Sequence, residues 1–211
     1  VSLVDISRAY FNAEIQRTVY VRLPSEAGYG SDMVGELVKC LHGTRDAAQG
    51  WEATYAAAMT KLGFHRGRSS PCVFHHPSRN MKCVVHGDDF FSEGLPADLA
   101  WFEKAILEVF EGKVKGRLAK SGDELRVLNR VVRRSESGYE WEADQRHAEI
   151  LVKELGLTAD SKPVACPGRK LSQKELEESE RAEERAGSGG EDTQYRALVA
   201  RANFLSADRP D

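Results

Sequence analysis

Apolar residues recur along the chain at two spacings, which predict two kinds of element. Short apolar runs, bounded by Gly, Pro, Ser or Asn, predict β-strands, and apolar residues three and four positions apart predict amphipathic helices. The expected strands lie at 1–6, 18–23, 35–41, 72–76, 81–85 and, with breaks, 113–143. The expected helices lie at 46–62, 96–110, 144–155 and 193–205. Because several strands follow one another between helices, the pattern predicts an α+β fold with an antiparallel sheet rather than alternating βαβ units.

The clearest helix is the one at 46–62. Asp46 is expected to cap its start and Gly63 to end it. The apolar stripe between them indicates a helix face packed in the core rather than a cofactor-binding surface. Its members are Ala47, Trp51, Tyr55, Met59 and Leu62.

The two later helices carry weaker stripes of the same kind. Asp144 is expected to cap the third helix, with Gly156 at its end, and Val152 and Leu155 among its inward residues. The last helix is expected to bury Tyr195, Leu198, Val199 and Ala202. Between them, 171–190 is rich in charge and is interpreted as a solvated helix or linker.

Composition adds the class of protein. The 211 residues are 41% hydrophobic and 30% charged, which suits one globular domain with a small appendage and a sizeable core. The 4 cysteines lack a regular spacing, which favours reduced thiols and an intracellular setting. The sequence shows neither a membrane-spanning apolar run nor a signal peptide. Both ends look cut, so we expect a piece of a longer polypeptide.

The net charge of −3 hides an uneven distribution. The segment 113–134 holds eight basic residues and only two acidic ones, Asp123 and Glu124. Such an excess can contact phosphates, or it can be the solvated face of a sheet. Both interpretations stay open at this point.

The most informative stretch is 84–91, Val-Val-His-Gly-Asp-Asp-Phe-Phe. The apolar strand before it and the aromatic pair after it place Asp88 and Asp89 near the turn of a hairpin. Adjacent carboxylates repel each other unless a cation lies between them, and Mg²⁺ prefers oxygen ligands. The alternative is that Gly-Asp-Asp is only turn chemistry. Asp5 is a second signal, because a lone carboxylate in an apolar strand is costly unless it is exposed or binds something.

In order, these segments resemble the motifs of copia-type retrotransposon reverse transcriptases. The stretch 5–12, Asp-Ile-Ser-Arg-Ala-Tyr-Phe-Asn, is similar to the first catalytic motif, and 19–24 to the strand that follows it. The stretch 40–51 resembles the segment Leu-Tyr-Gly-Leu-Lys-Gln-Ala-Pro-Arg-Gln-Trp, and 86–89 stands where the family has Tyr-Val-Asp-Asp. Further similarities continue in the same order at 62–64, 70–74, 162–167, 195–199 and 209–211.

The resemblance implies an RNA-directed DNA polymerase that uses two Mg²⁺ ions, with Mn²⁺ as an alternative. It assigns metal binding and catalysis to Asp5 and Asp88, with Asp89 in support. It makes Tyr10 the gate against a ribose 2′-hydroxyl, with a core aromatic as the alternative role for that ring. Gly43 would let the backbone approach the template–nucleotide pair, and Arg45 would meet phosphate.

The same resemblance implies a polymerase palm-like antiparallel sheet with packed helices, partial fingers and the start of a thumb. The expected parts are a palm at 1–143, a thumb-like helix and loop at 144–168, a charged linker at 169–192 and the start of a connection toward ribonuclease H at 193–211. Expected partners are an RNA template, a DNA or RNA primer and deoxynucleoside triphosphates, without a membrane. Fusion to integrase and ribonuclease H domains is expected, in a cytoplasmic virus-like particle or in the nucleus.

Several residues depart from the family pattern, and other readings compete with it. His86 and Gly87 replace the family's Tyr-Val, Ala48 replaces its proline, and the fingers segment expected before Val1 is absent from this sequence. One alternative is a catalytically inactive transposon remnant that binds nucleic acid, and another is a structural spacer between integrase and ribonuclease H. A third is a zinc module, since cysteine and histidine bind zinc. Its ligands would be Cys72, His75, Cys83 and His86.

Overall fold

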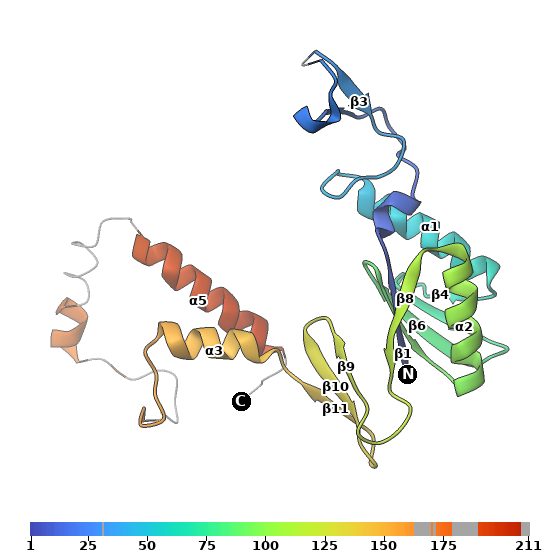
Figure 1. Cartoon of the computed structure of the whole chain (residues 1–211). Helices are drawn as coiled ribbons and strands as arrows, with labels where there is room; N and C mark the ends of the chain where they lie inside the picture. The colour runs from blue at the N-terminus through green and yellow to red at the C-terminus, as the bar shows by residue number, and fades with distance from the viewer. Residues whose placement is uncertain (31, 163–169, 171, 179–189, 208–211) are drawn as a thin grey trace. The chain divides into compact units, whose positions relative to one another are not determined.

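The computed structural model describes residues 1–30, 32–162, 170, 172–178 and 190–207 (Figure 1). Contacts within the chain divide it into two units. The first consists of Val1–Val127 and Arg133–Tyr139, and the second of Leu128–Val132 and Glu140–Asp211. All the candidate site residues lie in the first unit. The motifs expected at 163–167 and 209–211, and most of the charged segment, lie outside the described residues. The domain boundaries expected from the sequence stay predictions.

The first unit is built on a six-stranded sheet in the order β4-β5-β6-β7-β1-β8. Its strands are β1 (Ser2–Ile6), β4 (His65–Arg66), β5 (Val73–His76), β6 (Met81–His86), β7 (Asp89–Glu93) and β8 (Gly112–Arg117). All five neighbouring pairs are antiparallel, as the sequence predicts. The first strand of the chain lies between β7 and β8, so residues far apart in sequence become neighbours at the centre of the sheet.

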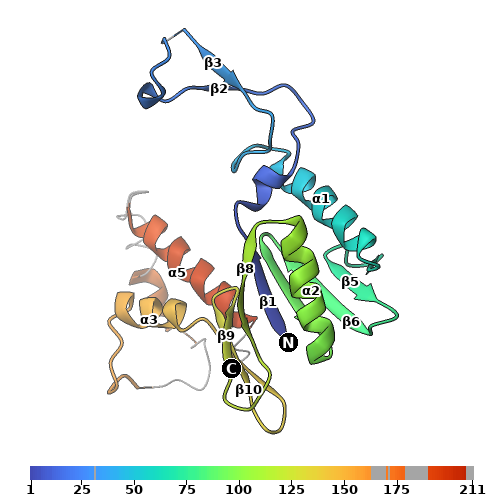
Figure 2. The same cartoon turned by 45° about the vertical axis from the view of Figure 1, so that its right-hand side comes forward.

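Helices α1 (Ala47–Lys61) and α2 (Pro96–Val109) cover one face of this sheet (Figure 2). The alternation of each strand decides which side chains they cover. Val4, Phe90 and Val85 lie side by side in register and join the core with Trp51 and Phe102 from the two helices. The neighbouring residues in each strand, which include Asp5 and Asp89, therefore point to the opposite face.

The first helix confirms the stripe read from the sequence. Ala47, Trp51, Tyr55 and Met59 are buried. Gly63, at φ +92°, follows the helix end. The expected capping bond is wrong, because Asp46 stands at the N-cap position without a side-chain capping hydrogen bond. Its carboxylate instead accepts a hydrogen bond from Nε of Arg17 at 3.1 Å.

Several smaller elements accompany the six-stranded sheet. Two short 3-10 helices are η1 (Ala9–Asn12) and η2 (Ser25–Ala27). A two-stranded sheet is formed by β2 (Tyr20–Arg22) and β3 (Val34–Glu36), and a three-stranded sheet in the order β11-β10-β9 is formed by β9 (Glu124–Val127), β10 (Arg130–Arg134) and β11 (Tyr139–Glu142). The turn between β9 and β10 consists of Leu128 and Asn129, both with positive φ. Sequence reasoning missed this turn because leucine rarely adopts that conformation. No helix among the described residues is long and apolar enough to cross a membrane.

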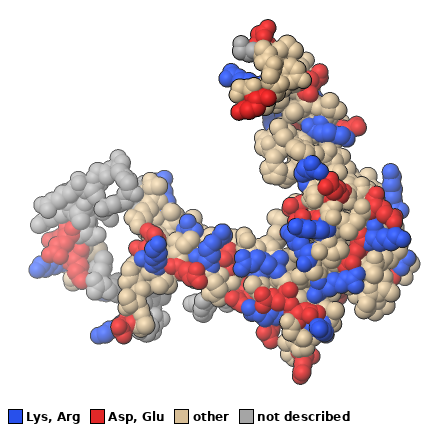
Figure 3. Space-filling model, in the orientation of Figure 1, with Lys and Arg blue, Asp and Glu red and all other residues tan. Residues whose placement is uncertain are grey.

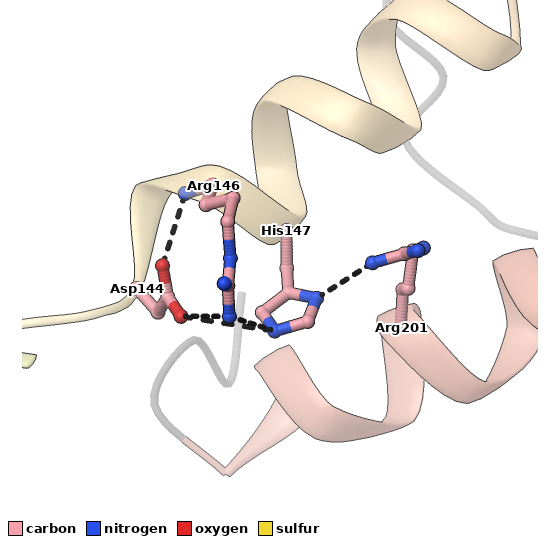
Figure 4. A network of polar contacts seen from close by, with 4 residues as sticks. All are labelled: Asp144, Arg146, His147 and Arg201. Carbon is pink, nitrogen blue, oxygen red and sulfur yellow. Dashed lines mark hydrogen bonds and ion pairs between the residues drawn. The ribbon is translucent and has the colours of Figure 1, made fainter. Parts of the chain in front are cut away.

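The second unit contains α3 (Gln145–Glu154) and α5 (Gly190–Ser206). Asp144 caps α3 as expected, since its carboxylate accepts a hydrogen bond from the backbone N–H of Arg146 at 3.1 Å. His147 lies between the helices, with its Nδ1 3.2 Å from Nη1 of Arg201 on α5 (Figure 4). The expected burial of Val152 and Leu155 on α3 is wrong, because both are exposed. The same holds for Tyr195, Val199 and Ala202 on α5.

Glu103 fixes α2 to the sheet. Its carboxylate, with only 9% of the side chain exposed, accepts hydrogen bonds from Ser2 Oγ at 2.5 Å and Arg117 Nε at 2.7 Å. Arg117 Nη2 donates to its second oxygen. Burial by itself raises the pKa of Glu103, but the hydrogen bonds from Arg117 and Ser2 outweigh it and hold the pKa below its ordinary value of 4.5.

This lowered pKa predicts loss of stability in acid. The unfolded chain binds a proton at Glu103 more readily than the folded chain does, so the free energy of unfolding falls as pH drops from about 4.5 through the folded pKa. Glu103→Gln should cost about 1–3 kcal/mol at neutral pH, because it leaves Arg117 without its anion. Urea unfolding from neutral pH to pH 3 would measure both effects. A variant with unchanged stability and an unchanged acid slope would contradict this role.

Candidate active site

The hairpin between β6 and β7 carries the acidic pair. His86 and Asp89 are paired across the two strands, and Gly87 and Asp88 form the turn between them. Two contacts fix this turn. The buried Trp51 donates a hydrogen bond from Nε1 to the carbonyl oxygen of Gly87 at 2.7 Å. The carbonyl oxygen of Asp88 accepts from the backbone N–H of Ile6, at the end of β1, at 2.9 Å. The turn is therefore held by both a helix and the central strand.

Asp5 and Asp89 face each other directly. They are partners in the antiparallel register of β1 and β7, so both side chains lie on the sheet face opposite α1 and α2. Their side chains are 18% and 16% exposed. Like charges directly opposite each other in a sheet are destabilising. The two carboxylates therefore need a cation.

Lys115 supplies that cation. Its Nζ lies 2.6 Å from Oδ2 of Asp5 and 3.1 Å from Oδ1 of Asp89. The register of β8 shifts at this point, with Val114 opposite Val4 and Gly116 opposite Leu3, so Lys115 is the extra residue of a β-bulge. Desolvation lowers the pKa of Lys115, but the hydrogen bonds to Asp5 and Asp89 outweigh it and raise the pKa above its usual value. The ammonium group is charged at neutral pH.

Asp88 lies in the turn, where its side chain is exposed, whereas Asp5 and Asp89 lie on paired strands. Within the described part of the chain, no three His, Cys, Asp or Glu side chains lie close enough together to hold a metal ion. The structure brings Asp5 together with Asp89, and places Asp88 beside them through its backbone. The assignment of Asp5, Asp88 and Asp89 as metal ligands stays a prediction.

The other candidate residues lie just beyond β1 and before α1. Tyr10, in η1, is half-buried and packs edge-on against His42, with ring centroids 4.5 Å apart. This contact brings η1 beside the loop that carries Gly43 and Arg45. Gly43 has φ +85° with open space around the position of a side chain, and Arg45 is exposed. The structure thus gathers Tyr10 with the loop at 42–45, while the roles of Tyr10, Gly43 and Arg45 stay predictions.

The basic segment 113–134 is largely engaged within the chain. Besides Lys115, Arg117 pairs with Glu103, Arg133 pairs with Glu124, and Arg134 lies over the ring of Tyr139. Figure 3 shows basic and acidic side chains interspersed over the face of the first unit that it draws. At least half of the eight basic residues therefore have partners within the chain, and phosphate binding by this segment stays a prediction.

The zinc alternative does not fit the sheet. Cys83 points into the core, where burial raises the pKa of its thiol to about 12, whereas His86 on the same strand is exposed. Cys72 and His75 are exposed as well. Residues three apart on a strand point to opposite faces, which separates Cys83 from His86.

Gly87 suits the backbone of the turn, and this gives a testable prediction. It has φ +61°, whereas Asp88 has a negative φ. The valine that the family has at this position would be strained there. Gly87→Val should therefore lower the free energy of unfolding by about 1–2 kcal/mol. A side chain here would meet no atom within 4 Å, so Gly87→Ala should cost nearly as much as Gly87→Val.

Urea unfolding of Gly87→Val, Gly87→Ala and Asp88→Ala would measure this strain. Asp88→Ala is the matched control, because it changes an exposed residue of the same turn that needs no positive φ. It should change stability by less than about 0.5 kcal/mol. If Gly87→Val is as stable as the unaltered protein, backbone strain does not explain this glycine.

Sequence reasoning missed three residues of the site. It placed Lys115 only in a basic segment, and it assigned Trp51 to the core without its hydrogen bond to the turn. It did not predict the contact between His42 and Tyr10. The one available signal was Asp5, whose lone carboxylate in an apolar strand demanded a partner.

Comparison with known proteins gives weak matches to one kind of polyprotein. No family model matches the chain. Over 109 residues, or 51% of its length, the chain is 26% identical to the transposon Ty1-MR1 Gag-Pol polyprotein of Saccharomyces cerevisiae. Over 99 residues it is 28% identical to the truncated transposon Ty1-A Gag-Pol polyprotein of the same organism. These matches span 6% and 8% of the two polyproteins. The chain is thus weakly homologous to Gag-Pol polyproteins of Ty1, a copia-type retrotransposon.

Proposed function

We propose that this chain is the palm-bearing part of a retrotransposon reverse transcriptase, an RNA-directed DNA polymerase. The observation that carries the proposal is the convergence of Asp5 and Asp89 on the face of an antiparallel sheet opposite its two helices. Asp5 comes from the segment that resembles the family's first catalytic motif, and Asp89 from the segment at its Asp-Asp motif. The weak homology to Ty1 Gag-Pol polyproteins supports a retrotransposon origin for the chain.

The donor set suits Mg²⁺. Asp5 and Asp89 present carboxylate oxygens toward one point, and that point already holds a positive charge, the ammonium group of Lys115. These two residues would hold Mg²⁺, and Asp88 would become a further ligand only if its exposed side chain turned toward them. When bound, the metal would stabilise charge on the entering 3′ oxygen and on the leaving pyrophosphate.

The residues of the chain contribute position and access. The helices lie on the other face, so a primer–template would approach the partly exposed carboxylates from the face that carries Lys115. Trp51 holds the turn against α1, so the acidic pair stays on a stiff frame. Tyr10, packed against His42, would place a flat ring beside the sugar of an incoming deoxynucleoside triphosphate. RNA template, primer and triphosphate would be the partners, inside a virus-like particle or the nucleus.

One observation favours a second candidate, an inactive remnant that binds nucleic acid. Lys115 contacts both carboxylates, and its single positive charge offsets one of their two negative charges. A site with a permanent internal cation would keep its fold but lose catalysis.

Primer extension separates the two candidates. The natural full-length polypeptide that carries this chain should extend oligo(dT) on poly(rA) with dTTP and Mg²⁺. The variant with both Asp88→Asn and Asp89→Asn should bind the primer–template but extend nothing. A well-folded, unaltered protein that binds the primer–template without extending it would overturn the polymerase and leave the remnant. Fluorescence anisotropy of a labelled primer–template measures the binding.

A further inference from the structure

Lys115 is the residue of the site that the proposed polymerase chemistry does not explain. We propose that Lys115 is an internal counter-cation, which holds Asp5 and Asp89 together without a metal and must leave before a divalent cation binds. Metal loading would then be an exchange of one cation for another. The proposal rests on the proposed function, because it concerns the same two carboxylates.

The geometry places the ammonium group between the two ligands. Nζ of Lys115 contacts an oxygen of each carboxylate, at 2.6 Å and 3.1 Å. Both distances are short enough for hydrogen bonds, which the charges of the two groups strengthen. A divalent cation shared by the same oxygens would stand close to Nζ and be repelled by it. The two cations therefore exclude each other.

Lys115 is also placed so that it can leave. Its side chain is 37% exposed, about twice the exposure of either aspartate. As the extra residue of the bulge in β8, it has no direct partner in the register with β1. A lysine side chain has a flexible four-carbon stem, so the ammonium group can turn to solvent without moving the strand. Asp5 and Asp89, fixed by the register, stay in place.

The exchange has a consequence for metal affinity. A divalent cation gains two carboxylates but must first break both contacts of Lys115. Removing the ammonium group removes this competition and leaves two like charges facing each other, which bind a cation more tightly. In a variant without this ammonium group, the stability of the fold should then depend on bound metal, because Lys115 no longer holds the two carboxylates together.

Mn²⁺ binding, followed by the electron paramagnetic resonance signal of free Mn²⁺, tests this exchange. Lys115→Met should bind Mn²⁺ at least about tenfold more tightly than the unaltered protein. Its thermal midpoint should fall in EDTA and recover when Mn²⁺ is added. Lys82→Met is the matched control, because it removes the same charge from the same sheet, at the end of β6 away from the acidic pair, where Lys82 pairs with Glu93. It should leave affinity within about threefold.

The remaining outcomes separate this proposal from the proposed function. Equal Mn²⁺ affinity in Lys115→Met and the unaltered protein overturns the exchange but agrees with the proposed metal site. An equal gain in Lys82→Met also overturns it, because net charge alone would then explain the effect. If folded Lys115→Met binds no Mn²⁺, both the exchange and the proposed metal site are overturned. Lys115→Arg keeps the charge and should bind no more tightly than the unaltered protein, which tests the exchange even if Lys115→Met does not fold.

Discussion

Asp5→Asn is expected to lower the rate of Mg²⁺-dependent primer extension by at least about 10³-fold, equivalent to about 4 kcal/mol of transition-state stabilisation. The amide cannot supply the negative charge with which Asp5 would hold the proposed Mg²⁺ beside Asp89. The fold should survive, because Lys115 keeps its contact with Asp89 and one of two facing like charges is removed. Unfolding free energy should therefore change by less than about 1 kcal/mol.

Single-turnover extension and urea unfolding of the same preparation would measure both quantities. Asp98→Asn is the matched control. Asp98 is 16% exposed, like Asp89, and pairs with Arg79 on the helix-covered side of the sheet. Its replacement should leave the extension rate within about threefold. An Asp5→Asn variant that keeps a tenth or more of the original rate would remove Asp5 from the catalytic site.

Much of the frame of this site could be predicted from local pattern. The apolar run at 81–85 and the aromatic pair after Asp89 are sufficient to place a hairpin turn. The stripe from Ala47 to Met59 is sufficient to place α1. The alternation of β1 also separates Val4, in the core, from Asp5, on the face opposite the helices. Each of these features depends on residues that are close together in the sequence, where periodicity carries the information.

The parts that could not be predicted depend on distant residues. Asp5 meets Asp89 because β1 lies beside β7, and no local pattern states which strands become neighbours. Lys115 reaches both carboxylates through a bulge in β8, and a shift of one residue leaves no signature in a strand of alternating lysines. Expected burial on α3 and α5 failed for a similar reason. A stripe shows which side chains share a face, but not whether another element covers it.

Gly87 is one of the departures from the family pattern, and the structure gives it a role in a turn rather than in a strand. From the sequence, Gly87 loosens the strand before the acidic pair. In the structure it stands after the end of β6, at a positive φ, with its carbonyl oxygen bound by Trp51. The glycine therefore suits a turn that is held in place from outside. The rigidity of the acidic pair rests on that hydrogen bond rather than on the side chain at 87.

Trp51→Phe tests this dependence, and we expect it to lower the free energy of unfolding by about 2–4 kcal/mol. Trp51 is 2% exposed and packs edge-on against Tyr55, Phe90 and Phe110. Phenylalanine keeps an aromatic ring in this cluster but loses volume and the indole N–H. The carbonyl oxygen of Gly87 is then left without its 2.7 Å donor. The turn that carries Asp88 loses its link to α1.

The kinetic effect distinguishes this role from general packing. If Trp51 positions the acidic pair, Trp51→Phe should lower kcat for extension by about 10-fold or more, while primer–template affinity stays the same. Trp101→Phe is the matched control, since Trp101 lies on α2 against Arg79 and keeps an aromatic ring there after replacement. It should leave kcat unchanged. Equal losses of kcat in the two variants would mean that the indole of Trp51 contributes only to the core, and that the hairpin holds the carboxylates without it.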